Sequence, residues 1–278
     1  MTASFHLTNE ITEIQRLSSE LLRFSEAAGL APDTVGDIRL ALEEVVSNIC
    51  RYGYERDQSG RIEVRLQRWG EAIRIEVRDD GRPFNPLSEA PSPNLVRPFP
   101  EREVGGLGIY LVRRVMDQVA YRFEHGQNVF IMEKAGGGHF RGRETPEGED
   151  MPLRITSHEK QPGVMVVTPS GSLDTTTYSM LDERLAGILE AHPHLLVLDM
   201  EHLDYISSIG ISTILKARKA MQKIGGRLTL MQLQPQVRKV FDIINALPSQ
   251  PIFSSTEELD AYLDRMQRDA SGGDNPIS

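Results

Sequence analysis

The sequence predicts an α/β (α+β) protein with two domains, an α/β sandwich followed by a mixed sheet with packed helices. Its 278 residues exceed the length of a typical single domain. Strand-like alternation and helical periodicity occur on both sides of residues 137–152, a segment rich in glycine and charge that cannot form a core. We therefore expect domains over residues 1–136 and 153–268, joined by this linker, and a disordered tail over 269–278.

The elements of the first domain follow from apolar spacing. Ile11, Ile14, Leu17, Leu21 and Phe24 recur at helical intervals, and a second apolar stripe of helical period follows. Two alternating strands, a proline-rich loop, a helix preceded by glycines and a closing strand come next, which predicts antiparallel strands with helices on one face. The expected ranges after the first helix are 35–52, 61–69, 72–79, 84–104, 105–119 and 128–134.

The second domain shows strands that alternate with helices. From Leu153 the pattern predicts strand, strand, helix, strand, helix, strand, helix and helix. Strands joined by crossover helices form a mostly parallel or mixed sheet with the helices packed on it. Asp174 and its neighbouring threonines are capping candidates for the first of these helices, and Ser255 with Glu258 forms a capping box for the last.

Composition excludes several classes of function. The net charge of −9, with no basic stripe, argues against direct binding of nucleic acid. No apolar run is long enough to cross a membrane, and the N-terminus lacks the layout of a signal peptide. The single cysteine, Cys50, excludes an intramolecular disulfide. We expect a cytoplasmic protein whose partners are proteins and small molecules.

Three segments of the first domain carry chemistry. Glu44, Asn48 and Arg51 share one helix face, where a carboxylate can accept a hydroxyl proton and an amide oxygen can bind Mg²⁺; a solvated face is the alternative. The sequence VRDDGRPF lies at the end of a strand. The aspartate at the strand end can accept a hydrogen bond from an exocyclic amine such as that of adenine. GGLG precedes a helix whose N-terminus suits phosphate.

In this order and spacing, LALEEVVSNICRYGY, DDGRPFNP and GGLGIYLVRRVMD resemble the GHKL ATP-binding superfamily, and most closely its anti-sigma-factor serine kinases. The resemblance implies a GHKL fold that binds ATP and Mg²⁺, with Glu44 as general base, Asn48 as Mg²⁺ ligand and Asp79 reading adenine. Some members have an arginine directly before the glycines; here Val104 stands there, and Arg102 is the nearest basic residue. The residues expected at ATP are Asn48, Arg51, Asp79, Gly81, Arg102, Gly106, Leu107 and Gly108.

The second domain resembles a STAS domain of the anti-sigma-factor antagonists, on GSLDTTT, LVLDMEHLDYISSIGISTIL and IGGRLTLMQLQPQVRKVFDI. That family has a D-S-x-G or S-S-x-G motif whose serine before x-G is phosphorylated. This implies Ser208 as phosphoacceptor, with Ser207 where an aspartate is frequent. From the residues alone, an N-cap of the following helix is the alternative.

Together the resemblances imply a partner-switching regulator, a serine kinase fused to its STAS antagonist that phosphorylates Ser208 in cis or in trans. The implied partners are ATP, a sigma factor or another client, other STAS antagonists, a PP2C-type phosphatase and a second copy in a homodimer. Two alternatives stay open: a nucleotide-gated scaffold without catalysis, and a kinase whose substrate is a separate STAS protein while the attached one inhibits it.

Overall fold

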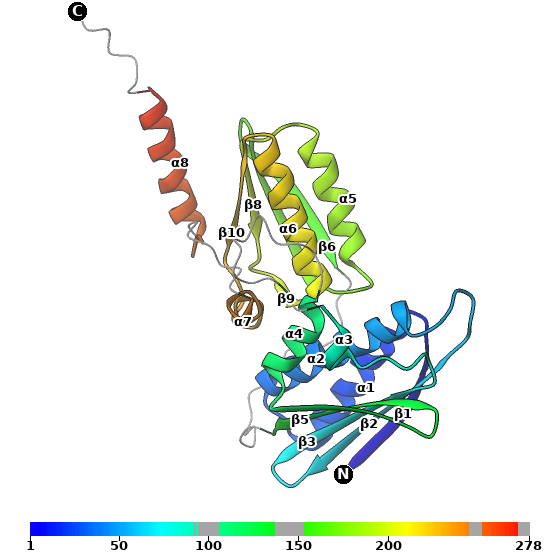
Figure 1. The fold of residues 1–278 in the computed structure, drawn as a ribbon. Helices are drawn as coiled ribbons and strands as arrows, with labels where there is room; N and C mark the ends of the chain where they lie inside the picture. Colours follow the sequence, from blue (N-terminus) through cyan, green and yellow to red (C-terminus); the bar gives the residue numbers. More distant parts are fainter. Residues whose placement is uncertain (92, 94–105, 137–152, 245–251, 272–278) are drawn as a thin grey trace, which may run out of the picture.

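The computed structural model describes residues 1–91, 93, 106–136, 153–244 and 252–271. It contains two sheets, each with its own helices, which we call the N-terminal and C-terminal domains (Figure 1). The N-terminal domain has β1 (Thr2–Thr8), α1 (Glu13–Ala28), α2 (Pro32–Tyr52), β2 (Arg61–Trp69), β3 (Ala72–Asp79), α3 (Pro86–Glu89), α4 (Leu107–Val115), β4 (Gln118–Glu124) and β5 (Gln127–Ala135). The C-terminal domain has β6 (Arg154–Gln161), β7 (Val164–Leu173), α5 (Tyr178–Leu189), β8 (Leu195–Asp199), β9 (Leu203–Ile206), α6 (Ser208–Lys223), β10 (Arg227–Met231), α7 (Pro235–Ile243) and α8 (Thr256–Ser271).

The N-terminal sheet is antiparallel in the order β1-β2-β3-β5-β4. Alternate residues of its central strands, such as Ile62, Val64 and Ile75, are fully buried and belong to the same core cluster as the apolar residues of α1, α2 and α4. Pro32 opens α2 at a position where its missing N–H costs nothing. The α/β sandwich expected from the sequence is therefore present, and α2 and α4 form its upper layer (Figure 1).

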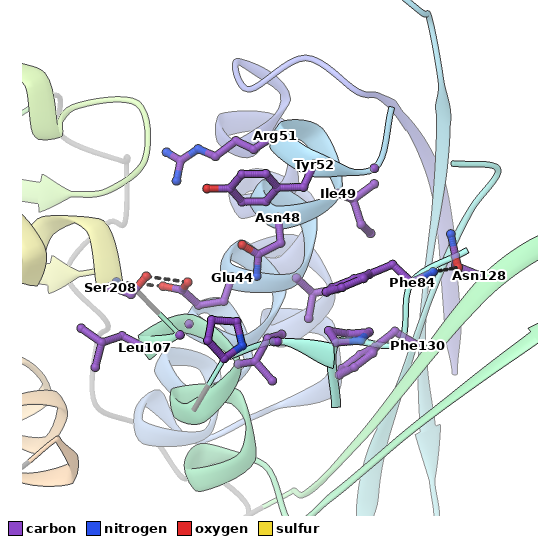
Figure 2. A pocket seen from close by; sticks show the side chains of 18 of the residues that line it. Glu44, Asn48, Ile49, Arg51, Tyr52, Phe84, Leu107, Asn128, Phe130 and Ser208 are labelled. Atoms are coloured by element: carbon purple, nitrogen blue, oxygen red, sulfur yellow. Dashed lines mark hydrogen bonds between the residues drawn. The ribbon is translucent and has the colours of Figure 1, made fainter. Parts of the chain in front are cut away.

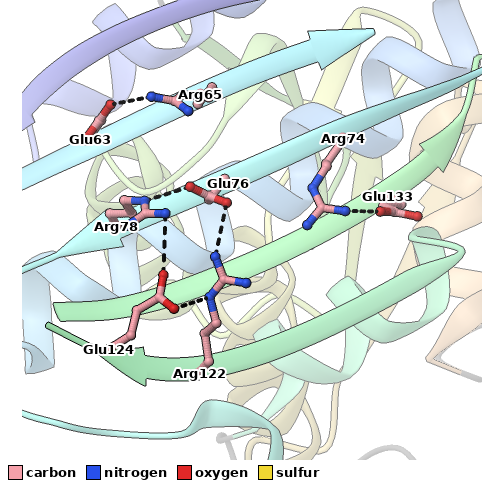
Figure 3. Close-up of polar contacts among 8 residues, drawn as sticks. All are labelled: Glu63, Arg65, Arg74, Glu76, Arg78, Arg122, Glu124 and Glu133. Carbon is pink, nitrogen blue, oxygen red and sulfur yellow. Dashed lines mark hydrogen bonds and ion pairs between the residues drawn. The ribbon is translucent and has the colours of Figure 1, made fainter. Parts of the chain in front are cut away.

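The other face of this sheet is charged. Alternating arginines and glutamates on β2 to β5 form a lattice of ion pairs (Figure 3). Its tightest members are Arg78 with Glu76 at 2.6 Å and Arg74 with Glu133 at 2.7 Å. Partly exposed pairs of this kind add about 0–1 kcal/mol each to stability. The lattice shows that this face of the sheet is exposed to solvent. The opposite face is the one covered by the helices, and these helices contact the C-terminal domain.

The C-terminal sheet is mixed, as expected. β10, β8 and β7 run parallel, β6 pairs antiparallel with β7, and β9 continues beside β7 beyond the end of β8. Helices cover both faces: α5 and α6 pack on one, and α8 packs on the other, where Val166 and Val197 meet Leu259 and Leu263. The N-terminal end of α6 points at α2 and α4 (Figure 1).

Four expectations from the sequence need correction. β1 was not expected, although Ala3, Phe5 and Leu7 alternate toward the core. The helix expected over 105–119 ends at Val115, because the next residues pair with β5 as β4. β9 was not expected either, because a strand of four residues is too short to show a period of alternating apolar residues. Helix α8 runs to Ser271, into the expected tail, since no helix breaker precedes Gly272.

The linker over residues 137–152 and most of the Phe84–Val104 loop, including Arg102 and Val104, lie outside the described residues. Within the parts that the structure describes, no helix combines the length and the apolar character needed to cross a membrane.

Candidate functional site

Glu44 lies at the contact between the two domains. It projects from the middle of α2 and is buried, and its carboxylate faces the first residue of α6. Its Oε2 accepts a hydrogen bond from the Ser208 hydroxyl at 2.6 Å, and its Oε1 accepts one from the Ser208 amide at 2.8 Å (Figure 2). Burial raises the pKa of Glu44, and the two Ser208 donors partly offset the rise. A carboxylate with a raised pKa is a better proton acceptor.

The two serines at the start of α6 have different roles. Ser207 holds the N-cap position with extended backbone, but its side chain caps no helix amide and is fully buried. Ser208 is the first helical residue, whose amide has no partner inside a helix. Glu44 supplies that partner from the other domain, and negative charge there suits the helix dipole. The N-cap alternative for the Ser208 side chain is therefore wrong, because Ser208 stands one position inside the helix and the N-cap position belongs to Ser207.

Asp79 ends β3 as a buried carboxylate. Its Oδ1 accepts the Gly81 amide at 3.0 Å and the Asn128 side-chain amide at 2.9 Å. Asn128 also donates to the Arg82 carbonyl and accepts from the Phe84 amide, so it fixes the loop that follows β3. Burial raises the pKa of Asp79, and the Asn128 and Gly81 donors lower it.

Glycines let α4 come close to α2. Gly106 adopts a left-handed conformation with φ of 72° directly before α4, which other residues rarely adopt. A Cβ on Gly108 would collide with the Glu44 carboxylate. The N-terminal amides of α4 therefore lie beside the helix face that carries Glu44 and Asn48.

A cavity of about 520 Å³ joins these parts. Glu44, Asn48 and Arg51 line it from α2, and Ser208 lines it from the C-terminal domain (Figure 2). Its inner end is apolar. The side chains there are Val45, Ile49, Phe84, Tyr121 and Phe130. Asp79 and the start of α4, from Gly106 to Gly108, complete the wall. Glu44, Asn48 and Arg51 thus lie on the helix that faces Ser208, and the Asp79 carboxylate and the Asn128 amide are polar groups among the apolar side chains of the remaining wall.

A second polar contact joins the domains beside the first. Glu43 is buried, and its Oε1 accepts both the amide and the hydroxyl of Thr175 at 2.9 Å. Arg39 stacks on the Tyr205 ring at 4.0 Å and donates to the Ser172 hydroxyl at 3.2 Å. These residues come from α2 on one side and from β7, β9 and the loop before α5 on the other.

A third contact is ionic. Asp37 of α2 is buried, and its carboxylate meets Lys239 of α7 at 2.5 Å and Lys134 of β5 at 2.8 Å. Two cations thus compensate one buried carboxylate, one from each domain. Buried charges need such partners.

Contact between the domains is expected to weaken as the pH rises toward 7. The pKa of Glu43 is raised from 4.5 to about 7, chiefly by burial and then by the neighbouring Asp174 and Glu44 carboxylates, against the opposing effects of Arg39 and Tyr205. The docked form therefore keeps a proton that an undocked, hydrated Glu43 releases above about 4.5. That stabilisation is complete below pH 4.5, is lost between 4.5 and 7, and amounts to about 3 kcal/mol.

Small-angle X-ray scattering across this pH range measures the opening. We expect the wild-type chain to expand as the pH rises and Glu43→Gln, which does not titrate, to lose most of the change. Equal expansion of both proteins would contradict the assignment to Glu43.

Most of the residues expected from the sequence lie together at this cavity. Glu44, Asn48, Arg51, Asp79, Gly106, Leu107, Gly108 and Ser208 all line the cavity, and Gly81 binds Asp79 at its edge. Arg102 lies outside the described residues. Sequence reasoning missed Glu43, Thr175 and Asn128. The Glu43–Glu44 doublet was a usable signal for the first, and a polar residue opening a buried strand was one for the last.

Comparisons with known proteins agree with this architecture. A family model described as a histidine kinase-like ATPase domain matches residues 7–134, and a STAS domain model matches residues 156–259. The putative anti-sigma factor antagonist BtrV of Bordetella bronchiseptica is 32% identical over 99 residues, 36% of this chain and 85% of BtrV. The serine-protein kinase RsbW of Listeria innocua is 23% identical over 131 residues, 44% of this chain and 78% of RsbW.

Among solved structures, the unphosphorylated anti-sigma factor antagonist SpoIIAA matches 41% of this chain and 96% of its own, with 21% identity and a TM-score of 0.36. The two domain models cover separate halves of the chain, and the matched relatives divide in the same way. The chain therefore carries a histidine kinase-like ATPase domain and a STAS domain, and through its STAS half it belongs to the family of anti-sigma factor antagonists.

Proposed function

We propose that this chain is an ATP-dependent protein serine kinase fused to its own antagonist, and that it phosphorylates Ser208 within the same chain. The observation that carries the proposal is the 2.6 Å hydrogen bond from the Ser208 hydroxyl to Glu44. A general base must lie within hydrogen-bond reach of the proton that it removes, and Glu44 does so inside a cavity that Asn48, Asp79 and the start of α4 also line.

Each residue has a distinct task in the transfer. Glu44 takes the proton of Ser208 as the hydroxyl oxygen forms a bond to the γ-phosphorus of ATP. The bond from that phosphorus to the bridging oxygen breaks, and ADP leaves with the electron pair. Asp79 accepts a hydrogen bond from the adenine amine, and the apolar end of the cavity takes the base.

The phosphates fit the start of α4. The first amides of a helix have no partners within it, and the residues at this helix start, Leu107, Gly108 and Ile109, line the cavity. Asn48 lies on the same face as Glu44 and offers an amide oxygen as a ligand for Mg²⁺. Mg²⁺ bound with ATP would neutralise charge on the phosphates during transfer.

Phosphorylation would then separate the domains. A phosphate adds about −1.5 to −2 charge, and Ser208 already faces Glu44, with Glu43 in the preceding position of α2. Repulsion and desolvation would displace the STAS domain and free the α2–α4 surface for a sigma factor or another client. A PP2C-type phosphatase would reset the switch, and a homodimer of the kinase domain is compatible with it.

Intact-mass measurement after incubation with ATP and Mg²⁺ tests the proposal. We expect the wild-type chain to gain one phosphoryl group and Ser208→Ala to gain none. Ser212→Ala is the matched variant, because Ser212 lines the same cavity one helical turn later. If Ser212→Ala gained no phosphate and Ser208→Ala still gained it, the phosphoacceptor would be Ser212 and not Ser208. Absence of phosphate on the wild-type chain would favour the non-catalytic scaffold.

A further inference from the structure

Two consecutive glutamates of α2 contact two different segments of the STAS domain. Glu44 contacts the start of α6 at Ser208, whereas Glu43 contacts the loop between β7 and α5 at Thr175. Glu44 lines the cavity, and Glu43 is not among the lining residues that the structure describes. Consecutive helix residues point about 100° apart, so one helix turn reaches both segments. Glu43 therefore has a contact of its own, separate from the reacting groups.

In the contact between Glu43 and Thr175, both residues are buried and held by their own domains. Glu43 and Thr175 are 2% and 5% exposed, and both Thr175 donors reach the same carboxylate oxygen at 2.9 Å. Asp174 accepts the amides of Thr176 and Thr177, which fixes the loop that presents Thr175. Arg39 lies nearby and partly offsets the rise that burial and the neighbouring carboxylates cause in the pKa of Glu43.

We propose that Glu43 is a positioning and specificity residue, which recognises Thr175 of the STAS domain and so sets the register in which Ser208 meets Glu44. Its consequence for phosphate transfer rests on the proposed kinase function, but the recognition itself does not. Contacts on separate segments fix the orientation of a docked domain, and the Glu43 contact lies one residue from Glu44, where it constrains the position of Ser208 most directly.

The same contact discriminates between STAS domains. A domain with a hydroxyl residue at the position of Thr175 gives Oε1 of the buried Glu43 two hydrogen-bond donors. A domain with an apolar residue there leaves the carboxylate underbonded in a dry interface, which is costly. The α2 surface thus disfavours STAS domains that lack this hydroxyl, because the buried Glu43 oxygen loses one of its two hydrogen bonds.

Hydrogen exchange of the full-length chain without nucleotide measures the recognition directly. The Ser208 and Thr175 amides donate to Glu44 and Glu43, so their protection reports domain docking. We expect Glu43→Ala to reduce the docking equilibrium about 10- to 100-fold, as the loss of two hydrogen bonds in a buried contact predicts. Thr175→Val, which removes one of the two donors, should have a smaller effect.

Matched variants make the test specific. Thr175→Ser and Glu43→Gln keep a donor and an acceptor and should retain most of the protection. Glu26→Ala removes an exposed glutamate of α1 and should change nothing. Because the two residues act as one contact, Glu43→Ala combined with Thr175→Val should be no worse than Glu43→Ala alone.

Phosphate incorporation and nucleotide affinity complete the experiment. Glu43→Ala should slow phosphorylation of Ser208 while the affinity for a fluorescent ATP analogue stays within about twofold, since Glu43 does not line the cavity. Unchanged protection of the Ser208 amide in both Glu43→Ala and Thr175→Val would overturn the inference. Absence of phosphate on the wild-type chain would overturn the kinase function instead. The hydrogen-exchange protection of the Ser208 and Thr175 amides would still decide whether Glu43 positions the STAS domain.

Discussion

Replacing Glu44 by Gln is expected to slow phosphate incorporation at Ser208 by about 10²- to 10⁴-fold, the usual contribution of a general base. Glutamine has nearly the same shape and keeps an oxygen that can accept the Ser208 amide. It cannot take the hydroxyl proton, so docking survives while the transfer fails. Intact-mass time courses with saturating ATP and Mg²⁺ measure the rate.

The pH profile separates this role from a structural one. Burial raises the pKa of Glu44, and the ionised form is the base, so the wild-type rate should fall as the pH drops through that raised pKa. Glu44→Gln should lack this dependence and should bind nucleotide as wild type does. Glu26→Gln, an exposed glutamate of α1, serves as the control. If the Glu44→Gln chain kept the wild-type rate of phosphate incorporation, Glu44 would not be the general base.

Replacing Asp79 by Ala is expected to weaken binding of adenine nucleotides about 100-fold. The change deletes the proposed acceptor for the adenine amine. It also leaves the Asn128 amide without one of its partners, in a buried position that fixes the loop after β3. Titration with a fluorescent ATP analogue measures the affinity, and a thermal melt verifies that the variant folds.

The adjacent Asp80 provides the control. Its carboxylate is exposed and accepts from the Tyr54 hydroxyl and the Arg61 amide instead of lining the cavity. Asp80→Ala should therefore keep the nucleotide affinity. Equal losses in the two variants would show that the loop as a whole, and not the Asp79 carboxylate, determines binding.

The sequence predicted local features of the site better than long-range ones. The spacing of Glu44, Asn48 and Arg51 places them on one helix face whatever the rest of the chain does. The bond between Glu44 and Ser208 depends on how two folded surfaces meet, which no local pattern encodes. Glu43 was overlooked for the same reason, since its partner Thr175 belongs to the other domain.

The misplaced elements have similar causes. Helical periodicity continues past Val115, and only pairing with β5 turns the following residues into β4. β1 alternates correctly, but it is stabilised as an edge strand by β2, which lies fifty residues further on. Asn128 became visible as a site residue only when the register of β3 with β5 placed it opposite Asp79. In each case a partner distant in sequence decided the outcome.

Mixing two inactive chains tests the central claim, that Glu44 and Ser208 of the same chain react. Glu44→Gln retains the acceptor without the base, and Ser208→Ala retains the base without the acceptor. Incubated together with ATP and Mg²⁺, neither chain should gain phosphate, while wild-type protein gains it at a rate constant independent of its concentration. Phosphate on the Glu44→Gln chain in the mixture would contradict the account.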